Sequence, residues 1–116
     1  MKISEIRDLL NAEVLCLEEQ LDTDVHSACG SDMMSDVLAY VKDQAVLLTG
    51  LVNSQVIRTA QMMDMVCVVF VRSKRPTLEM IEIAEENGIV LLATEKRMYE
   101  ACGTLYLNGL GGASHE

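Results

Sequence analysis

Residues 66–71 of the chain read Val-Cys-Val-Val-Phe-Val, six apolar side chains in a row, of which four are β-branched. A strand that shows one face to water alternates apolar and polar side chains. An uninterrupted apolar run therefore indicates a strand that is buried on both faces. Such a strand needs a sheet with helices on both sides. We predict that residues 66–71 form the central strand of that sheet.

A basic turn follows this run at once, since residues 72–77 read Arg-Ser-Lys-Arg-Pro-Thr. The turn holds three of the nine basic residues of a chain whose net charge is −9. Thr77 is a suitable helix cap, and cations beside a helix N-terminus favour an anion. Two interpretations stay open. The turn is a solvated loop that balances the Glu-rich helix after it, or it binds a phosphate or nucleotide. The residues that would bind it are Arg72, Ser73, Lys74, Arg75 and Thr77.

Strand and helix patterns alternate from residue 45 onward. Apolar runs at 45–48, 66–71 and 89–92 alternate with helical patterns that begin near Ser54, Thr77 and Glu95. Short links between such elements indicate right-handed βαβ units and a mainly parallel sheet. Before residue 45 we predict four further elements: a helix from Ser4, strands at 13–17 and 25–30, and a helix capped by Ser31 with an apolar stripe of Met33, Met34, Val37, Leu38 and Val41.

These elements predict an α/β fold: a single compact domain with a mainly parallel sheet and helices on both faces. At 116 residues the chain has the size of one domain. We place this domain at residues 1–108 and expect residues 109–116, which contain three glycines, to form a flexible C-terminal tail.

The strand ends extend the candidate anion site. Ligands of parallel sheets collect at the carboxyl ends of the strands. Thr49 and Thr94 each follow a predicted strand, as the basic turn does, and so join the candidate ligand-binding residues. We expect any small ligand to be anionic and to lie between residues 72–77 and 94–97. Helix N-terminal amides at Thr77 and Glu95 would assist.

The composition argues against two classes of partner. The acidic net charge would repel nucleic acid and anionic membrane surfaces. The aromatic residues are Phe70, Tyr40, Tyr99 and Tyr106, too few for a base-stacking platform. No apolar run approaches the ~20 residues that span a bilayer. We expect neither nucleic acid nor membrane as a partner, and a cytoplasmic location.

Catalytic and metal patterns are weak. No P-loop, GxSxG or HExxH pattern occurs, so we expect no enzyme activity and no cofactor. Asp32 and Asp36 form either a carboxylate pair or a capped helix start with solvent-facing acids. The four cysteines lack CxxC spacing and indicate buried reduced thiols. His26 and Cys29 are the best metal candidates, but on one strand they would point to opposite faces, and we expect no metal site.

Three stretches resemble one family. Residues 29–37 (Cys-Gly-Ser-Asp-Met-Met-Ser-Asp-Val), 68–76 (Val-Val-Phe-Val-Arg-Ser-Lys-Arg-Pro) and 84–94 (Ala-Glu-Glu-Asn-Gly-Ile-Val-Leu-Leu-Ala-Thr) have the order and spacing of DRTGG domain motifs. Over about residues 1–107 the chain resembles a stand-alone DRTGG domain, a module similar to the N-terminal domain of HPr kinase/phosphorylase. Residues 22–28 lack the arginine and paired glycines of the naming motif, and Lys74 replaces a family glycine.

The resemblance implies a regulatory role. DRTGG modules accompany CBS domains, phosphotransacetylases or kinases, or stand alone. We therefore expect a non-catalytic regulatory or assembly module that acts on a partner enzyme, such as a kinase or metabolic enzyme, as a homodimer. The alternative is a sensor domain that binds a phosphorylated small molecule or nucleotide at the strand carboxyl ends. The methionines fill the core or form an adaptable partner surface: Met33, Met34, Met62, Met63 and Met65.

Overall fold

The structure is a computed structural model that describes residues 1–40 and 44–111. The strands are β1 (Glu13–Cys16), β2 (Ser27–Gly30), β3 (Ala45–Thr49), β4 (Cys67–Phe70) and β5 (Val90–Ala93). The helices are α1 (Ile3–Leu10), α2 (Met34–Tyr40), α3 (Ser54–Met62), α4 (Leu78–Glu86) and α5 (Met98–Leu107), with a short 3-10 helix, η1 (Glu18–Gln20). Within the described residues none of these helices is long and apolar enough to span a membrane.

The sheet has the spatial order β1-β5-β4-β3-β2. The pairs β2–β3, β3–β4 and β4–β5 are parallel, whereas β1 joins the outer side of β5 as an antiparallel edge strand. Strand β4 is the third of five and every one of its residues is buried. The predicted α/β fold, mainly parallel sheet and central position of residues 66–71 are confirmed.

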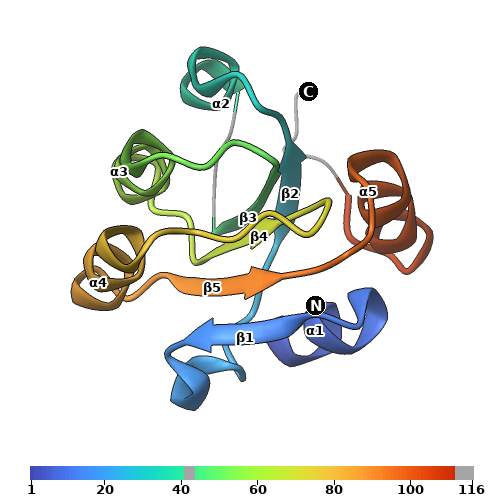
Figure 1. The fold of residues 1–116 in the computed structure, drawn as a ribbon. Coiled ribbons are helices and arrows are strands. Elements are labelled where there is room, and N and C mark those ends of the chain that lie inside the picture. The colour runs from blue at the N-terminus through green and yellow to red at the C-terminus, as the bar shows by residue number, and fades with distance from the viewer. Residues whose placement is uncertain (41–43, 112–116) are drawn as a thin grey trace.

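Helices cover both faces of the sheet, as Figure 1 shows: α2, α3 and α4 lie on one side, and α1 and α5 on the other. The central strand supplies both cores in alternation. Val68 and Phe70 pack towards α2, α3 and α4. Cys67 and Val69 pack towards α1 and α5. Side chains on both faces of β4 thus lose contact with water, which explains why the run contains no polar residue.

Three helices begin at residues other than predicted. Helix α2 begins at Met34, so Ser31 does not cap it, and the Ser31 hydroxyl instead accepts the Met33 amide at 2.9 Å in the turn before the helix. Helix α1 begins at Ile3, not at Ser4, and the backbone amide of Lys2 donates to the Glu5 carboxylate at 2.8 Å. Helix α5 begins at Met98 instead of Glu95, because the Thr94 hydroxyl accepts the Lys96 amide at 3.2 Å and holds residues 94–96 in a turn. No helix N-terminus therefore lies at Glu95, and that part of the anion-site prediction is wrong.

Some predicted core residues face solvent. On α2, Met34 and Val37 are buried and Leu38 is exposed, because this helix contacts the sheet through a narrow face. Met33, which precedes the helix, is also exposed. Val41 lies outside the described residues. Leu78 at the start of α4 is also exposed. The methionines divide between the two interpretations: Met34 and Met65 are buried, Met63 packs partly against the core, and Met33 and Met62 are exposed.

Residues 109–111 belong to the packed domain and not to a tail. Leu110 is buried and its amide donates to the Leu105 carbonyl at 3.0 Å. The Gly111 carbonyl accepts the amide of Ala28 on β2, also at 3.0 Å. The predicted boundary at residue 108 is therefore too early. The rest of the predicted tail, residues 112–116, lies outside the described residues.

Candidate functional site

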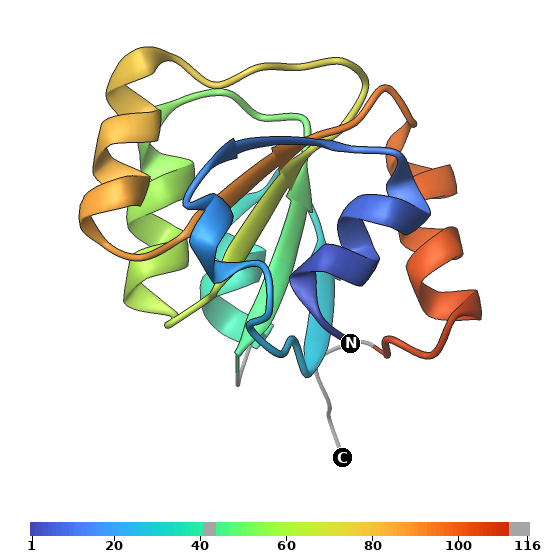
Figure 2. The same ribbon diagram turned by 90° about the horizontal axis from the view of Figure 1, so that it is seen from below.

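The loops that follow β3, β4 and β5 gather at the carboxyl edge of the sheet, as Figure 2 shows. All of the predicted ligand-binding residues lie at this edge or in the turn beside it. The structure does not join them into one site. It divides them between a cluster around Asp32, an ion pair with a small polar pocket, and a helix cap.

Asp32 is the centre of the first cluster. Its Oδ1 accepts the Thr49 hydroxyl at 2.9 Å and the Gly50 amide at 2.7 Å. The Thr49 Oγ1 in turn accepts the amide of Leu51 at 3.1 Å. The Gly50 amide, then the Thr49 hydroxyl and the Arg72 charge, hold the pKa of Asp32 below its ordinary value, against an opposing effect of burial. Thr49 thus serves this carboxylate instead of an incoming ligand.

Arg72 lies against the same cluster. Its Nη2 is 4.0 Å from Asp32 Oδ2, and its guanidinium occupies the space where a side chain at position 50 would lie. Arg72 and Ser73 both have left-handed backbone angles, with φ of 58° and 59°. Their amides donate to the carbonyls of Lys96 and Thr94 at 2.8 and 3.0 Å. These bonds stabilise two consecutive left-handed residues, which are unfavourable for side chains with a Cβ.

Arg75 forms a different contact. Its Nη1 and Nη2 donate to the two carboxylate oxygens of Glu13 at 3.0 and 3.2 Å. This bidentate bond lowers the pKa of Glu13 and raises the pKa of Arg75. The Thr77 Oγ1 accepts the Met80 amide at 3.2 Å, so Thr77 caps α4 as predicted. The cap therefore already satisfies the Met80 amide, one of the helix N-terminal amides that were predicted to assist an anion.

A polar pocket of about 350 Å³ lies beside the Arg75–Glu13 pair. Its charged lining is Arg75, Lys96, Glu13 and Glu95, which balances two cations against two carboxylates. Thr94 also lines it, but is buried and donates through Oγ1 to the Leu10 carbonyl at 2.7 Å. The pocket is therefore polar and close to neutral, not cationic.

Sequence reasoning missed the role of Asp32. The alternatives considered were a carboxylate pair with Asp36 or a solvent-facing acid, whereas Asp32 links the loop after β2 to the loop after β3. A signal was present: β2 and β3 were both predicted, and parallel neighbours place their carboxyl ends together. Their pairing would have brought Asp32 next to Thr49 and Gly50.

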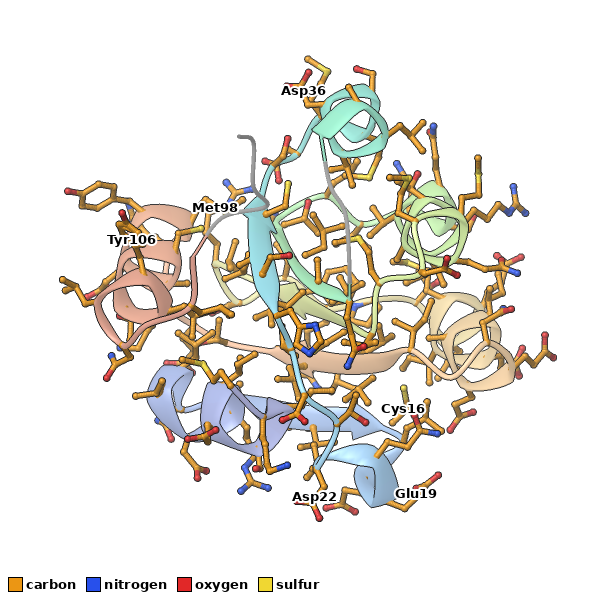
Figure 3. The ribbon with its side chains drawn as sticks, turned by 180° about the vertical axis from the view of Figure 1, so that it is seen from behind. Cys16, Glu19, Asp22, Asp36, Met98 and Tyr106 are labelled. Atoms are coloured by element: carbon orange, nitrogen blue, oxygen red, sulfur yellow. The ribbon has the colours of Figure 1, made fainter. Side chains whose placement is uncertain are left out.

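A larger groove was also missed. It has a volume of about 1030 Å³ and lies between α5 and the edge strand β2. We call it the α5–β2 groove. Its lining is mostly apolar and includes Gly30, Leu48, Met98, Cys102 and Leu110. Figure 3 shows Met98 on the side of α5 that faces β2, with Tyr106 on the same helix. No motif marks this groove, because its walls come from three separated segments.

The thiols are reduced and mostly shielded. Cys16, Cys29, Cys67 and Cys102 are all free, and desolvation by burial raises the pKa of each thiol, most strongly that of Cys67. Over residues 1–40 and 44–111, no group of three or more His, Cys, Asp or Glu side chains is arranged to hold a metal ion.

Comparisons with known proteins identify the family. The profile of the DRTGG domain matches residues 5–106. A solved structure of similar fold is that of the CBS and DRTGG domains of the regulatory region of Clostridium perfringens pyrophosphatase, complexed with the activator diadenosine tetraphosphate. The TM-score is 0.77 at 16% identity, over 90% of this chain and 45% of that one, so this chain spans less than half of that structure. Comparison with curated proteins gave no match. The chain therefore belongs to the DRTGG domain family.

Proposed function

We propose that the protein is a non-catalytic regulatory module that acts on a partner enzyme as a homodimer. The observation that carries the proposal is the DRTGG match over residues 5–106. A structure of the same fold comes from the regulatory region of a pyrophosphatase, and regulation of an enzyme is the role that we carry over.

The geometry of the strand ends supports this role. Asp32 contacts both Thr49 and Arg72, and Arg75 contacts Glu13. These contacts hold the loops of the carboxyl edge in place. They do not aim a nucleophile and a base at a common point, which is the arrangement that covalent catalysis requires.

The test is the response of a partner enzyme. The tagged chain is expressed in its native cell, the enzyme that copurifies is identified, and its rate is measured with and without added purified chain. We expect the rate of the enzyme to change at saturation with the chain, with no turnover by the chain alone. Turnover by the chain alone, or an enzyme rate that never responds, would contradict the proposal.

The second candidate function is a sensor of a phosphorylated small molecule or nucleotide at the strand carboxyl ends. One observation favours it: Arg75, Thr94 and Lys96 line one pocket beside the basic turn. Glu13 and Glu95 line the same pocket and balance its two cations. A bound anion would have to compete with Asp32 for Arg72 and with Glu13 for Arg75. We therefore expect modest affinity that weakens with salt.

Calorimetry with adenine nucleotides and inorganic phosphate tests the sensor. Binding should be lost in the double variant Arg72→Ala/Arg75→Ala. The matched control is Lys2→Ala/Arg58→Ala, which makes the same change in net charge away from the carboxyl edge. Binding that survives in Arg72→Ala/Arg75→Ala would show that the ligand binds elsewhere. Binding that falls equally in both variants would show that only the overall charge matters.

A further inference from the structure

The outer face of α5 is exposed and almost free of charge, since Glu100 at its margin is the one charged residue of this helix. We define the α5 face as Tyr99, Gly103, Tyr106 and Leu107. The side chains of Tyr99, Leu107 and Tyr106 are 92%, 87% and 70% exposed. The spacing of residues 99, 103 and 106 places them on one side of a helix. Two of the three tyrosines of the chain therefore lie in water on one helix.

Gly103 has no explanation within its own chain. It lies inside α5, where glycine is less favourable than alanine. Its φ is not positive, so the backbone does not require glycine. A Cβ at this position would meet nothing within 4 Å, so neighbouring atoms do not require it either. Gly30 is different, because a Cβ there would lie 2.5 Å from Cys102 Sγ. An outward-facing glycine in a helix allows the backbone of another helix to approach closely.

The α5 face is continuous with the α5–β2 groove. Tyr99, Gly103, Tyr106 and Leu107 line this groove together with residues of β2. Glu100 is the one charged residue in its described lining. Figure 1 shows β2 at the end of the sheet next to α5, with no helix beyond it on that side among the described segments.

The net charge of the chain indicates which partner binds the α5 face. A second copy also carries a net charge of −9, so two copies repel each other except through a surface that is almost free of charge. The α5 face is such a surface. A strongly basic partner would instead gain most from the acidic surfaces elsewhere on the chain.

The area is sufficient for a dimer. The exposed parts of Tyr99 and Tyr106 amount to roughly 250–400 Å² of surface. A standard interface buries about 800 Å² on each partner, so these two rings supply a third to a half of it. Leu107 and the walls of the groove contribute the rest.

The pattern is also self-complementary. Tyr99 lies four residues before Gly103, and Tyr106 lies three residues after it. When two α5 helices cross antiparallel at Gly103, Tyr99 of each copy meets Tyr106 of the other copy. A two-fold interface requires this kind of reciprocal contact.

We propose that the α5 face and the adjoining α5–β2 groove form the homodimer interface, with two α5 helices crossing at Gly103. The inference deepens the proposed function, since it rests on the homodimer and names the surface that forms it.

Sedimentation equilibrium of the intact chain over micromolar concentrations tests the interface. We expect twice the monomer mass of 12.8 kDa. Gly103→Ala should raise the dimer dissociation constant about tenfold or more, while urea unfolding of the dilute monomer shows equal or greater stability. Because the alanine improves the helix and meets nothing in its own chain, loss of the dimer cannot be attributed to misfolding.

A charge variant provides the second test. Leu107→Glu should also dissociate the dimer. Its matched control is Met62→Glu, at the last residue of α3, where the side chain is 69% exposed and the charge change is the same. A dimer that resists both Gly103→Ala and Leu107→Glu would overturn the interface but leave the homodimer in place. A chain that stays monomeric would overturn both, and the regulatory role would still be decided by the enzyme assay.

Discussion

Removal of the Asp32 carboxylate should destabilise the fold more than its exposed position implies. Asp32→Ala deletes the acceptor of two hydrogen bonds, from the Thr49 hydroxyl and the Gly50 amide. Thr49 is fully buried, so its hydroxyl is not easily satisfied by water. An unsatisfied buried donor costs about 1–3 kcal/mol. Since the Asp32 side chain is 53% exposed, water can reach the Gly50 amide, and we expect a total loss of about 2 kcal/mol.

The pH dependence of this loss tests its cause. The folded state lowers the pKa of Asp32, chiefly through the Gly50 amide. The stabilisation from Asp32 is therefore fully present above the ordinary aspartate pKa of about 3.9 and disappears as the pH falls through the folded value. The difference between wild type and Asp32→Ala should thus be largest at neutral pH and should shrink in acid. Asp32→Asn, which keeps an oxygen acceptor, should cost less at neutral pH.

Urea unfolding followed by circular dichroism measures these differences. Asp36→Ala is the matched control, since it removes an exposed aspartate from α2. We expect that control to change the free energy of unfolding by less than about 0.5 kcal/mol. The reasoning is refuted if Asp32→Ala costs no more than Asp36→Ala, or if its cost is the same in acid as at neutral pH.

Three further predictions concern the packing. Gly30→Ala should lower the free energy of urea unfolding by about 1–3 kcal/mol, because its Cβ would lie 2.5 Å from Cys102 Sγ. Adding Cys102→Ala should restore most of this loss, and strictly additive effects of the two substitutions would contradict the contact. Phe70→Ala should cost about 3–5 kcal/mol, because this ring is fully buried in the central strand; a melting temperature within a few degrees of wild type would count against that position. Cys67 should resist thiol reagents until the chain unfolds, since burial raises its pKa and excludes the reagent; mass spectrometry that finds Cys67 modified as fast as Cys102 in the native protein would disagree.

The fold could be predicted to the extent that local patterns determine it. The apolar run at 66–71 identifies the central strand, and Thr77 with Asn87-Gly88 marks both ends of α4. The start of α5 could not be predicted in this way. The Thr94 hydroxyl closes a turn on the Lys96 amide and also donates to the Leu10 carbonyl, a residue 84 positions earlier. The role of Thr94 depends on how α1 packs against the sheet, and the residues next to Thr94 in the sequence do not reveal that packing.

The candidate site shows the same limit. The spacing of Thr49, the basic turn and Thr94 correctly predicts that they share the carboxyl edge of the sheet. It does not predict their partners. Arg75 bonds Glu13 across 62 positions, and Arg72 approaches Asp32 from a strand two places away in the sheet. Such pairs can be predicted only when the strand order is known. The arginines that the sequence suggests are free to bind a ligand therefore already contact carboxylates in the fold.

The position of β1 has a consequence for synthesis and folding. Strands β2, β3, β4 and β5 lie side by side in the same order as in the chain, so each can pair with its predecessor as it leaves the ribosome. Strand β1 is made first but pairs with β5, joining Glu13 to Ala93. Helix α1 likewise buries Ile3 and Leu10 in a core that includes β5. Residues 3–16 must therefore wait, with their apolar side chains exposed, until residues 90–93 have been synthesised, and a chaperone would protect the chain most during this interval.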